Sequence, residues 1–146
     1  MSRNKEICMI KTEILHPQLL ETLAKCGHKT NILIADSNYS FVTNSSPHAT
    51  IVYLNFCVGE IKSTLILEKI LKYINVEKAV LMESPADFVN EIEAEYKKLL
   101  PEAVEIAHVA RNEFYSLAKS NDTLLVIATG ENRRFANILL TVGVVA

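Results

Sequence analysis

Short aliphatic runs, each bounded by polar residues, recur along this chain of 146 residues. The clearest are residues 31–35 and 124–128, which are too short for core helices and typical of strands buried on both faces. Between such runs lie segments with apolar residues at helical spacing, of which 61–74 is the longest. This alternation predicts an α/β fold, with a mostly parallel or mixed sheet flanked by helices.

The same patterns predict the other elements. Further strands are expected at 50–54, 79–82 and 103–109, and a final apolar segment covers 138–145. Helices are expected from Pro17 to just before Gly27, over 61–74, from Pro85 through Leu99, and over 114–119. Residues 37–48 form a long loop rich in Ser and Asn, and residues 1–10 a loose N-terminal tail. With 49% hydrophobic residues and no repeat or linker, residues 1–146 are expected to form a single domain.

Charge and cysteine usage narrow the class of protein. The net charge is −2 and the basic residues are scattered, which argues against a nucleic-acid partner. No apolar stretch approaches the ~20 residues that a bilayer requires, and the N-terminus has no long apolar core, so neither a membrane partner nor a signal peptide is expected. The three cysteines form no C-x-x-C pair, which favours a reducing, cytoplasmic location. The four histidines show no metal-ligand spacing, so no metal site is expected.

Polar residues follow three of the predicted strands at the point where each ends. Asp36 follows 31–35, Glu83 and Ser84 follow 79–82, and residues 129–132 follow 124–128. Ligands of open α/β sheets collect at the carboxyl ends of the strands. If these strands are parallel neighbours, the three segments meet at one edge and predict a polar ligand there.

His28 and Asp36 are the candidate acid–base residues. His28 lies just past a predicted helix C-terminus, where the dipole favours a protonated imidazole suited to general acid catalysis. Asp36 is separated from it by a five-residue strand of roughly 17 Å, so the two should cooperate only through a spanning ligand or across a subunit interface. Each also has a structural interpretation, which the residues alone leave open: His28 as a helix-capping side chain and Asp36 as a turn residue.

Two runs resemble a known family. Residues 27–38 (GHKTNILIADSN) resemble the "GH…(I/L)AD.N" signature of the D-ribose pyranase / L-fucose mutarotase family. Residues 128–144, which contain ATGE and FANILL, resemble its closing "TGE…Y(A/G)N.IL..GV". Residues 83–86 and 111–115 are similar to the fucose branch, and the resemblance extends from Ile14 to the end of the chain.

The resemblance implies a function. Members interconvert anomers, or pyranose and furanose forms, of free aldoses without cofactor or metal, and assemble into ring-shaped homo-oligomers, commonly decamers, with each site near a subunit interface. His28 matches the proton-donating histidine of the family. Five residues match its sugar-binding positions: Asp36, Arg111, Phe135, Ala136 and Asn137. The expected ligand is therefore a small monosaccharide, fucose-like or ribose-like.

The chain also departs from the family pattern. Phe135 stands where the family has tyrosine, which removes a phenolic hydroxyl from the expected site. Asn55 replaces an acidic residue of the fucose branch, and residues 42–59 match poorly. These departures keep a second hypothesis open, namely a non-catalytic monosaccharide-binding or transport-associated protein that retains the family pocket.

Overall fold

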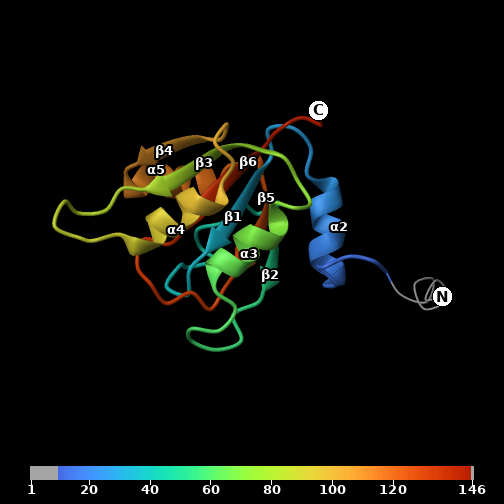
Figure 1. Ribbon diagram of the computed structural model, residues 1–146, viewed down its shortest axis with the longest axis horizontal. Coiled ribbons are helices and arrows are strands. Elements are labelled where there is room, and N and C mark those ends of the chain that lie inside the picture. Colours follow the sequence, from blue (N-terminus) through green and yellow to red (C-terminus); the bar gives the residue numbers. More distant parts are fainter. Residues whose placement is uncertain (1–9, 146) are drawn as a thin grey trace.

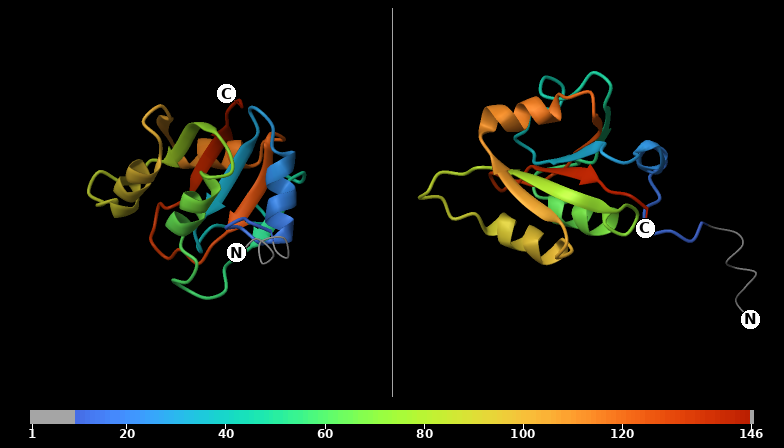
Figure 2. Two further views of the ribbon diagram at one scale, coloured as in Figure 1. Left: turned by 45° about the vertical axis from the view of Figure 1, so that its right-hand side comes forward. Right: turned by 90° about the horizontal axis from the view of Figure 1, so that it is seen from above.

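A six-stranded mixed sheet forms the centre of the molecule, with helices on both of its faces (Figures 1 and 2). The computed structural model describes residues 10–145, so the predicted tail at 1–10 lies, except for Ile10, outside the described residues. The strand order is β2-β5-β1-β6-β3-β4. The elements are α2 (Pro17–Lys25), β1 (Asn31–Ala35), β2 (Thr50–Tyr53), α3 (Ser63–Ile70), β3 (Val76–Met82), α4 (Glu91–Leu99), β4 (Glu105–Val109), α5 (Arg111–Ala118), β5 (Thr123–Ala128) and β6 (Ile138–Val142).

Strand direction decides which loops meet. Among the six strands of residues 10–145, β6 alone runs opposite to the others. It lies between β1 and β3, and Ile138 at its start pairs with Ile34 near the end of β1. The residues that precede β6 therefore lie at the same edge as Asp36, which follows β1.

The alternation of side chains along β1 divides the core in two. Ile32 and Ile34 are wholly buried in the larger cluster, which they share with α2, α3 and α4. Leu33 and Ala35 point to the other face and join a smaller cluster beneath α5. The right-hand view of Figure 2 shows α5 on one side of the sheet and α3 and α4 on the other. Because both faces are covered, β1 is a continuous apolar run.

The α/β class and the mixed sheet are confirmed, but some boundaries differ. The helix predicted from Pro85 begins instead at Glu91, because Asn90 accepts a hydrogen bond from the Glu93 backbone N–H (3.1 Å) and so caps α4. The helix predicted over 61–74 is shortened to α3 at both ends: Ile61 adopts a φ of 56°, outside the helical region, and residues 71–74 form a turn. No helix within residues 10–145 has the length and apolar character needed to cross a membrane.

Candidate functional site

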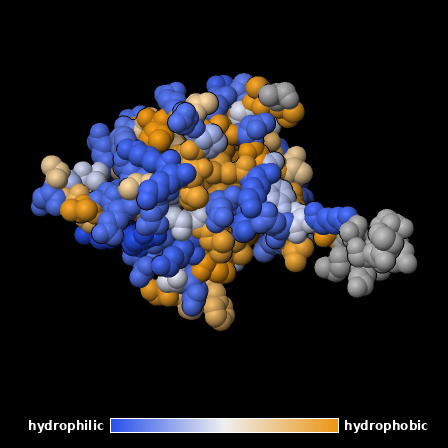
Figure 3. Space-filling model, viewed as in Figure 1, coloured by the Kyte–Doolittle hydropathy of each residue, from blue (hydrophilic) through white to orange (hydrophobic). Residues whose placement is uncertain are grey.

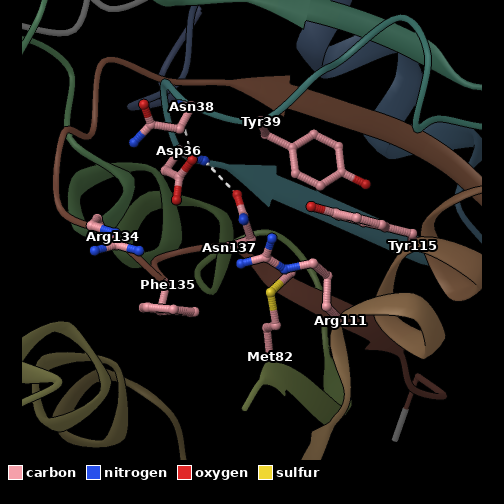
Figure 4. Close-up of a pocket in the computed structure, with 9 residues that line it drawn as sticks. All are labelled: Asp36, Asn38, Tyr39, Met82, Arg111, Tyr115, Arg134, Phe135 and Asn137. Atoms are coloured by element: carbon pink, nitrogen blue, oxygen red, sulfur yellow. Dashed lines mark hydrogen bonds between the residues drawn. The ribbon is translucent and has the colours of Figure 1, made fainter. Parts of the chain in front are cut away.

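A cavity of about 330 Å³ opens at the edge where β1 and β3 end, where α5 begins and where the loop before β6 returns to the sheet. Figure 4 shows side chains from these segments converging on it. The lining residues are Asp36, Asn38, Tyr39, Met82, Arg111, Tyr115, Arg134, Phe135 and Asn137.

Asp36 is the anchored carboxyl group of this cavity. One carboxylate oxygen accepts from the Asn38 backbone N–H (3.0 Å) and the other from that of Ala136 (3.4 Å). The Asp36 N–H in turn donates to Oδ1 of Asn137 (2.7 Å; Figure 4). Asp36 is only 3% exposed. Burial raises the pKa of the Asp36 carboxyl, although the backbone donors at Asn38 and Ala136 oppose the change. A carboxyl group in such a place is suited to exchange protons nearer neutral pH than a surface aspartate.

An ion pair with a buried carboxylate supports the loop between β5 and β6, which carries one wall of the cavity. Glu131, with no exposed surface, accepts from Arg133 Nε (2.9 Å) and from the hydroxyl of Ser63 (3.1 Å). Arg133 also donates to Glu95 of α4 (2.5 Å). Burial alone would raise the pKa of Glu131, but the Arg133 guanidinium more than offsets it and holds that pKa below its usual range. The loop is thus tied to both α3 and α4.

The hydroxyl of Tyr96 fixes the same loop closer to the cavity. Tyr96 is wholly buried, and its hydroxyl lies 2.5 Å from the Ala136 carbonyl oxygen and 2.6 Å from Ser63 Oγ. Ala136 therefore lies beneath the cavity, where its backbone holds Asp36 and its carbonyl is held by α4.

Phe135 enters the cavity through an unusual backbone conformation. Its φ of 57° lies in the left-handed region, which costs a non-glycine residue roughly 1–3 kcal/mol. The bonds that hold Ala136 and Asn137 on either side of Asp36 sustain that conformation. The ring meets Phe88 edge-on, with centroids 4.9 Å apart, and the Arg134 guanidinium carbon lies 5.3 Å from the Phe135 centroid.

Two tyrosines form the opposite wall. The Tyr39 hydroxyl donates to the Asn44 carbonyl (2.7 Å), and burial raises the pKa of Tyr39. Tyr115 meets the Tyr39 ring edge-on at 5.8 Å, and its hydroxyl has no hydrogen-bond partner within residues 10–145. Tyr39 therefore shapes the loop, whereas Tyr115 can offer its hydroxyl to a ligand.

His28 lies at the opposite edge of the sheet, before β1. Its Nε2 is 2.9 Å from Oε1 of Glu77 near the start of β3, and Glu77 also bonds to Lys29. His28 lines a second cavity, of about 380 Å³, together with Asn75 and the residues that follow β6. Within one protomer His28 and Asp36 share no cavity.

Comparison with known proteins identifies the family. Residues 9–145 match the model of the RbsD / FucU transport protein family. The chain belongs to the RbsD/FucU family. It is 30% identical to human (Homo sapiens) fucose mutarotase, with 91% of each chain covered. It is also 30% identical to D-ribose pyranase from Thermosipho africanus (strain TCF52B), covering 94% of this chain and 99% of the relative.

The fold is shared with solved members of the RbsD/FucU family. The structure of Bacillus subtilis RbsD complexed with D-ribose superposes with a TM-score of 0.82 at 26% identity. That similarity covers 94% of this chain and all of the RbsD chain. The chain therefore shares the fold of RbsD over most of its length.

The structure brings most of the predicted RbsD/FucU site residues together. Asp36, Arg111, Phe135 and Asn137 line the first cavity, and Ala136 supports it from below. His28 lies outside it. Of the three polar segments expected to meet at this edge, only Asp36 lines the cavity. Glu83, Ser84 and residues 129–132 do not, whereas Met82, the last residue of β3, does.

Sequence reasoning did not assign Met82, Tyr115 or Arg134 to the site. Two of them had detectable signals: Met82 ends a predicted strand, and Tyr115 lies four residues after Arg111, on the same side of α5. Arg134 had none beyond its place next to Phe135. Within residues 10–145, no three His, Cys, Asp or Glu side chains gather as candidate metal ligands.

Proposed function

We propose that this chain interconverts anomers, or pyranose and furanose forms, of a free monosaccharide by acid–base catalysis that needs no cofactor. The observation that carries the proposal is the anchored Asp36 carboxyl, buried and with a raised pKa, in a cavity of about 330 Å³. Membership of the RbsD/FucU family and relatives named fucose mutarotase and D-ribose pyranase support a sugar isomerase.

The reaction needs two proton transfers. Opening a cyclic hemiacetal requires a proton on the ring oxygen and loss of one from the anomeric hydroxyl. Asp36 is placed to exchange one of these protons, and Asn137 and Tyr115 offer hydrogen bonds to the sugar hydroxyls. Positioned acid–base groups typically contribute about 10²–10⁴-fold.

The second proton belongs, in this proposal, to His28 of a neighbouring protomer. Because His28 and Asp36 lie at opposite edges of one sheet, a ring-shaped homo-oligomer, such as the decamer expected from the family, would join one protomer's His28 edge to the next protomer's cavity. Exposed apolar side chains support such an interface: Val144 and Val145 line the His28 cavity, and Val89 lies in the loop before α4. Figure 3 also shows apolar side chains gathered in the middle of the face that carries α3.

The cytoplasm is the location that the proposal favours. Cys26 and Cys57 are free thiols in the described part of the chain, as a reducing compartment allows. Residues 1–146 would then act as one sugar-converting domain.

Saturation-transfer NMR on the anomeric protons of L-fucose, D-ribose and related aldoses tests the function. The protein should accelerate exchange over the spontaneous rate, and His28→Ala should remove most of the acceleration. The matched control is His48→Ala, which alters an exposed histidine outside both cavities. If no aldose exchanges faster with the protein than without it, the proposal fails.

Phe135 favours a second candidate, a monosaccharide-binding protein without activity. Its ring occupies the cavity wall but offers no hydroxyl to a sugar. Calorimetry separates the two functions, because this alternative requires that sugars bind while their anomeric exchange stays at the spontaneous rate.

A further inference from the structure

Two guanidinium groups line the cavity against a single carboxyl group. Arg111 begins α5 and Arg134 lies in the loop before β6, and both are exposed at the cavity. The other lining side chains, apart from Asp36, are uncharged. The cavity thus carries a net positive charge, although the chain as a whole is negative.

Neither arginine is neutralised by the protein. Within residues 10–145, neither Arg111 nor Arg134 has a carboxylate partner. The neighbouring Arg133 differs, because Glu131 and Glu95 both bind its guanidinium. Two adjacent arginines in one loop are therefore used differently: Arg133 holds the loop, whereas Arg134 keeps its N–H donors available.

Aromatic rings hold Arg134 at the cavity. Its guanidinium carbon lies 5.3 Å from the centroid of Phe135 and 5.9 Å from that of Phe88. Stacking of this kind restrains a guanidinium without occupying its in-plane N–H donors. In Figure 4 the guanidinium groups of Arg134 and Arg111 flank Phe135, with Asp36 at another side of the cavity.

We infer that the monosaccharide bound here carries a carboxylate or phosphate group, and that Arg134, whose charge remains after those of Arg111 and Asp36 cancel, selects it. An anionic group matches the paired donors of a guanidinium and cancels the excess charge. Asp36 and Arg111 would then contact the sugar hydroxyls while Arg134 binds the anion. The inference rests on the proposed function and names the substrate class of the same site.

Calorimetry with matched sugars tests the inference on the full-length protein. D-galactose is compared with D-galacturonate and D-galactose 6-phosphate, and D-ribose with D-ribose 5-phosphate. At least one anionic member should bind about tenfold or more tightly than its neutral parent. The carboxylate and phosphate arms show which anion is preferred. The preference should shrink as salt is raised, because exposed charges are screened.

Variants then assign the preference to the cavity. Arg134→Gln should reduce the ratio of the affinities for the anionic and the neutral sugar about tenfold. Arg134→Lys should retain part of it. Lys119→Gln, which removes an exposed cation at the other end of α5, serves as the matched control and should leave the preference intact.

The outcomes separate the two proposals. Neutral sugars that exchange while anionic sugars bind no better would overturn the inference and leave the proposed function standing. Anionic sugars that bind tightly through Arg134 without accelerated exchange would support the inference and remove the catalytic function. Failure of every sugar to bind would overturn both, and an anion preference that Arg134→Gln leaves unchanged would overturn the role of Arg134.

Discussion

The two edges of the sheet hold their acid–base groups in opposite ways. At the edge where β1 ends, Asp36 is buried, bonded mainly to backbone groups, and has a raised pKa. At the edge where β1 begins, His28 is partly exposed and shares Glu77 with Lys29, and the pKa of Glu77 is lowered by its bonds to Lys29 and His28. The cavity edge thus disfavours a negative charge on Asp36, whereas the edge that carries His28 stabilises the negative charge of Glu77.

The two edges of one protomer therefore carry different acid–base groups. The cavity edge carries a buried carboxyl group, and the other edge carries a partly exposed imidazole among charged side chains. In the proposed function each edge supplies one half of a site that two protomers share. The following experiments test that division.

The largest effect is expected from Asp36→Asn. The proposed proton exchange is lost, so anomeric exchange should fall about 10²-fold or more in saturation-transfer NMR. The stability of the variant relative to wild type should depend on pH. Because the pKa of Asp36 is higher folded than unfolded, wild-type stability declines as pH rises through the unfolded value, and this deficit persists above the folded value.

Asparagine carries no such charge but can accept only one of the two backbone N–H bonds, so the melting temperature of the variant relative to that of wild type should rise from pH 3 to pH 7. Asp122→Asn, an exposed aspartate outside the cavity, is the control and should change neither quantity. A relative melting temperature that falls over this pH range would show that Asp36 stabilises the fold as a carboxylate.

The next largest effect is expected from mixing two inactive proteins. His28→Ala and Asp36→Asn are unfolded together and refolded, so that protomers of both kinds enter one assembly. If the site joins one protomer's His28 edge to another's Asp36 cavity, some sites regain both residues and exchange returns in part. Each variant refolded alone is the control. A mixture as inactive as its components would contradict the proposal that His28 of one protomer and Asp36 of another form one site.

Much of the fold was predictable because a strand that is buried on both faces is an unbroken apolar run in the sequence. The aliphatic runs at β1 and β5 match the observed strands closely. The start of α4 was missed because Asn90, and not Pro85, supplies the cap. At the site, Asp36 and residues 135–137 were expected together through the family resemblance, and the antiparallel β6 explains physically why they meet.

Other parts of the site could not be predicted from sequence patterns. The left-handed φ of Phe135 and the contacts of Arg134 with two aromatic rings depend on contacts that form only after β5, β6 and α4 are assembled. The bond between His28 and Glu77 likewise joins residues 49 positions apart, brought close because β6 pairs with both β1 and β3.

A smaller effect is expected from Glu77→Gln. Glutamine keeps the shape of the side chain but replaces the charged acceptor beside the imidazole with a neutral one, so His28 is held less firmly. If His28 delivers the proton, anomeric exchange should fall about tenfold in saturation-transfer NMR. Glu105→Gln, an exposed glutamate on β4, is the control. An unchanged rate of exchange would mean that Glu77 does not support the proton donor.

The smallest effect is expected from Phe135→Tyr, which alters the cavity and leaves the His28 edge untouched. The added hydroxyl can reach a bound sugar, and one hydrogen bond is worth about 0.5–1.5 kcal/mol, or roughly two- to tenfold in exchange rate or affinity. The left-handed backbone at 135 should be kept, because the bonds from Asp36 to Ala136 and Asn137 persist. Wild type and variant are compared by calorimetry and NMR with the same sugar. A gain in affinity alone identifies a binding contact. A gain in exchange far above tenfold would instead identify the hydroxyl as a proton carrier, so that both proton transfers would occur within the cavity of one protomer.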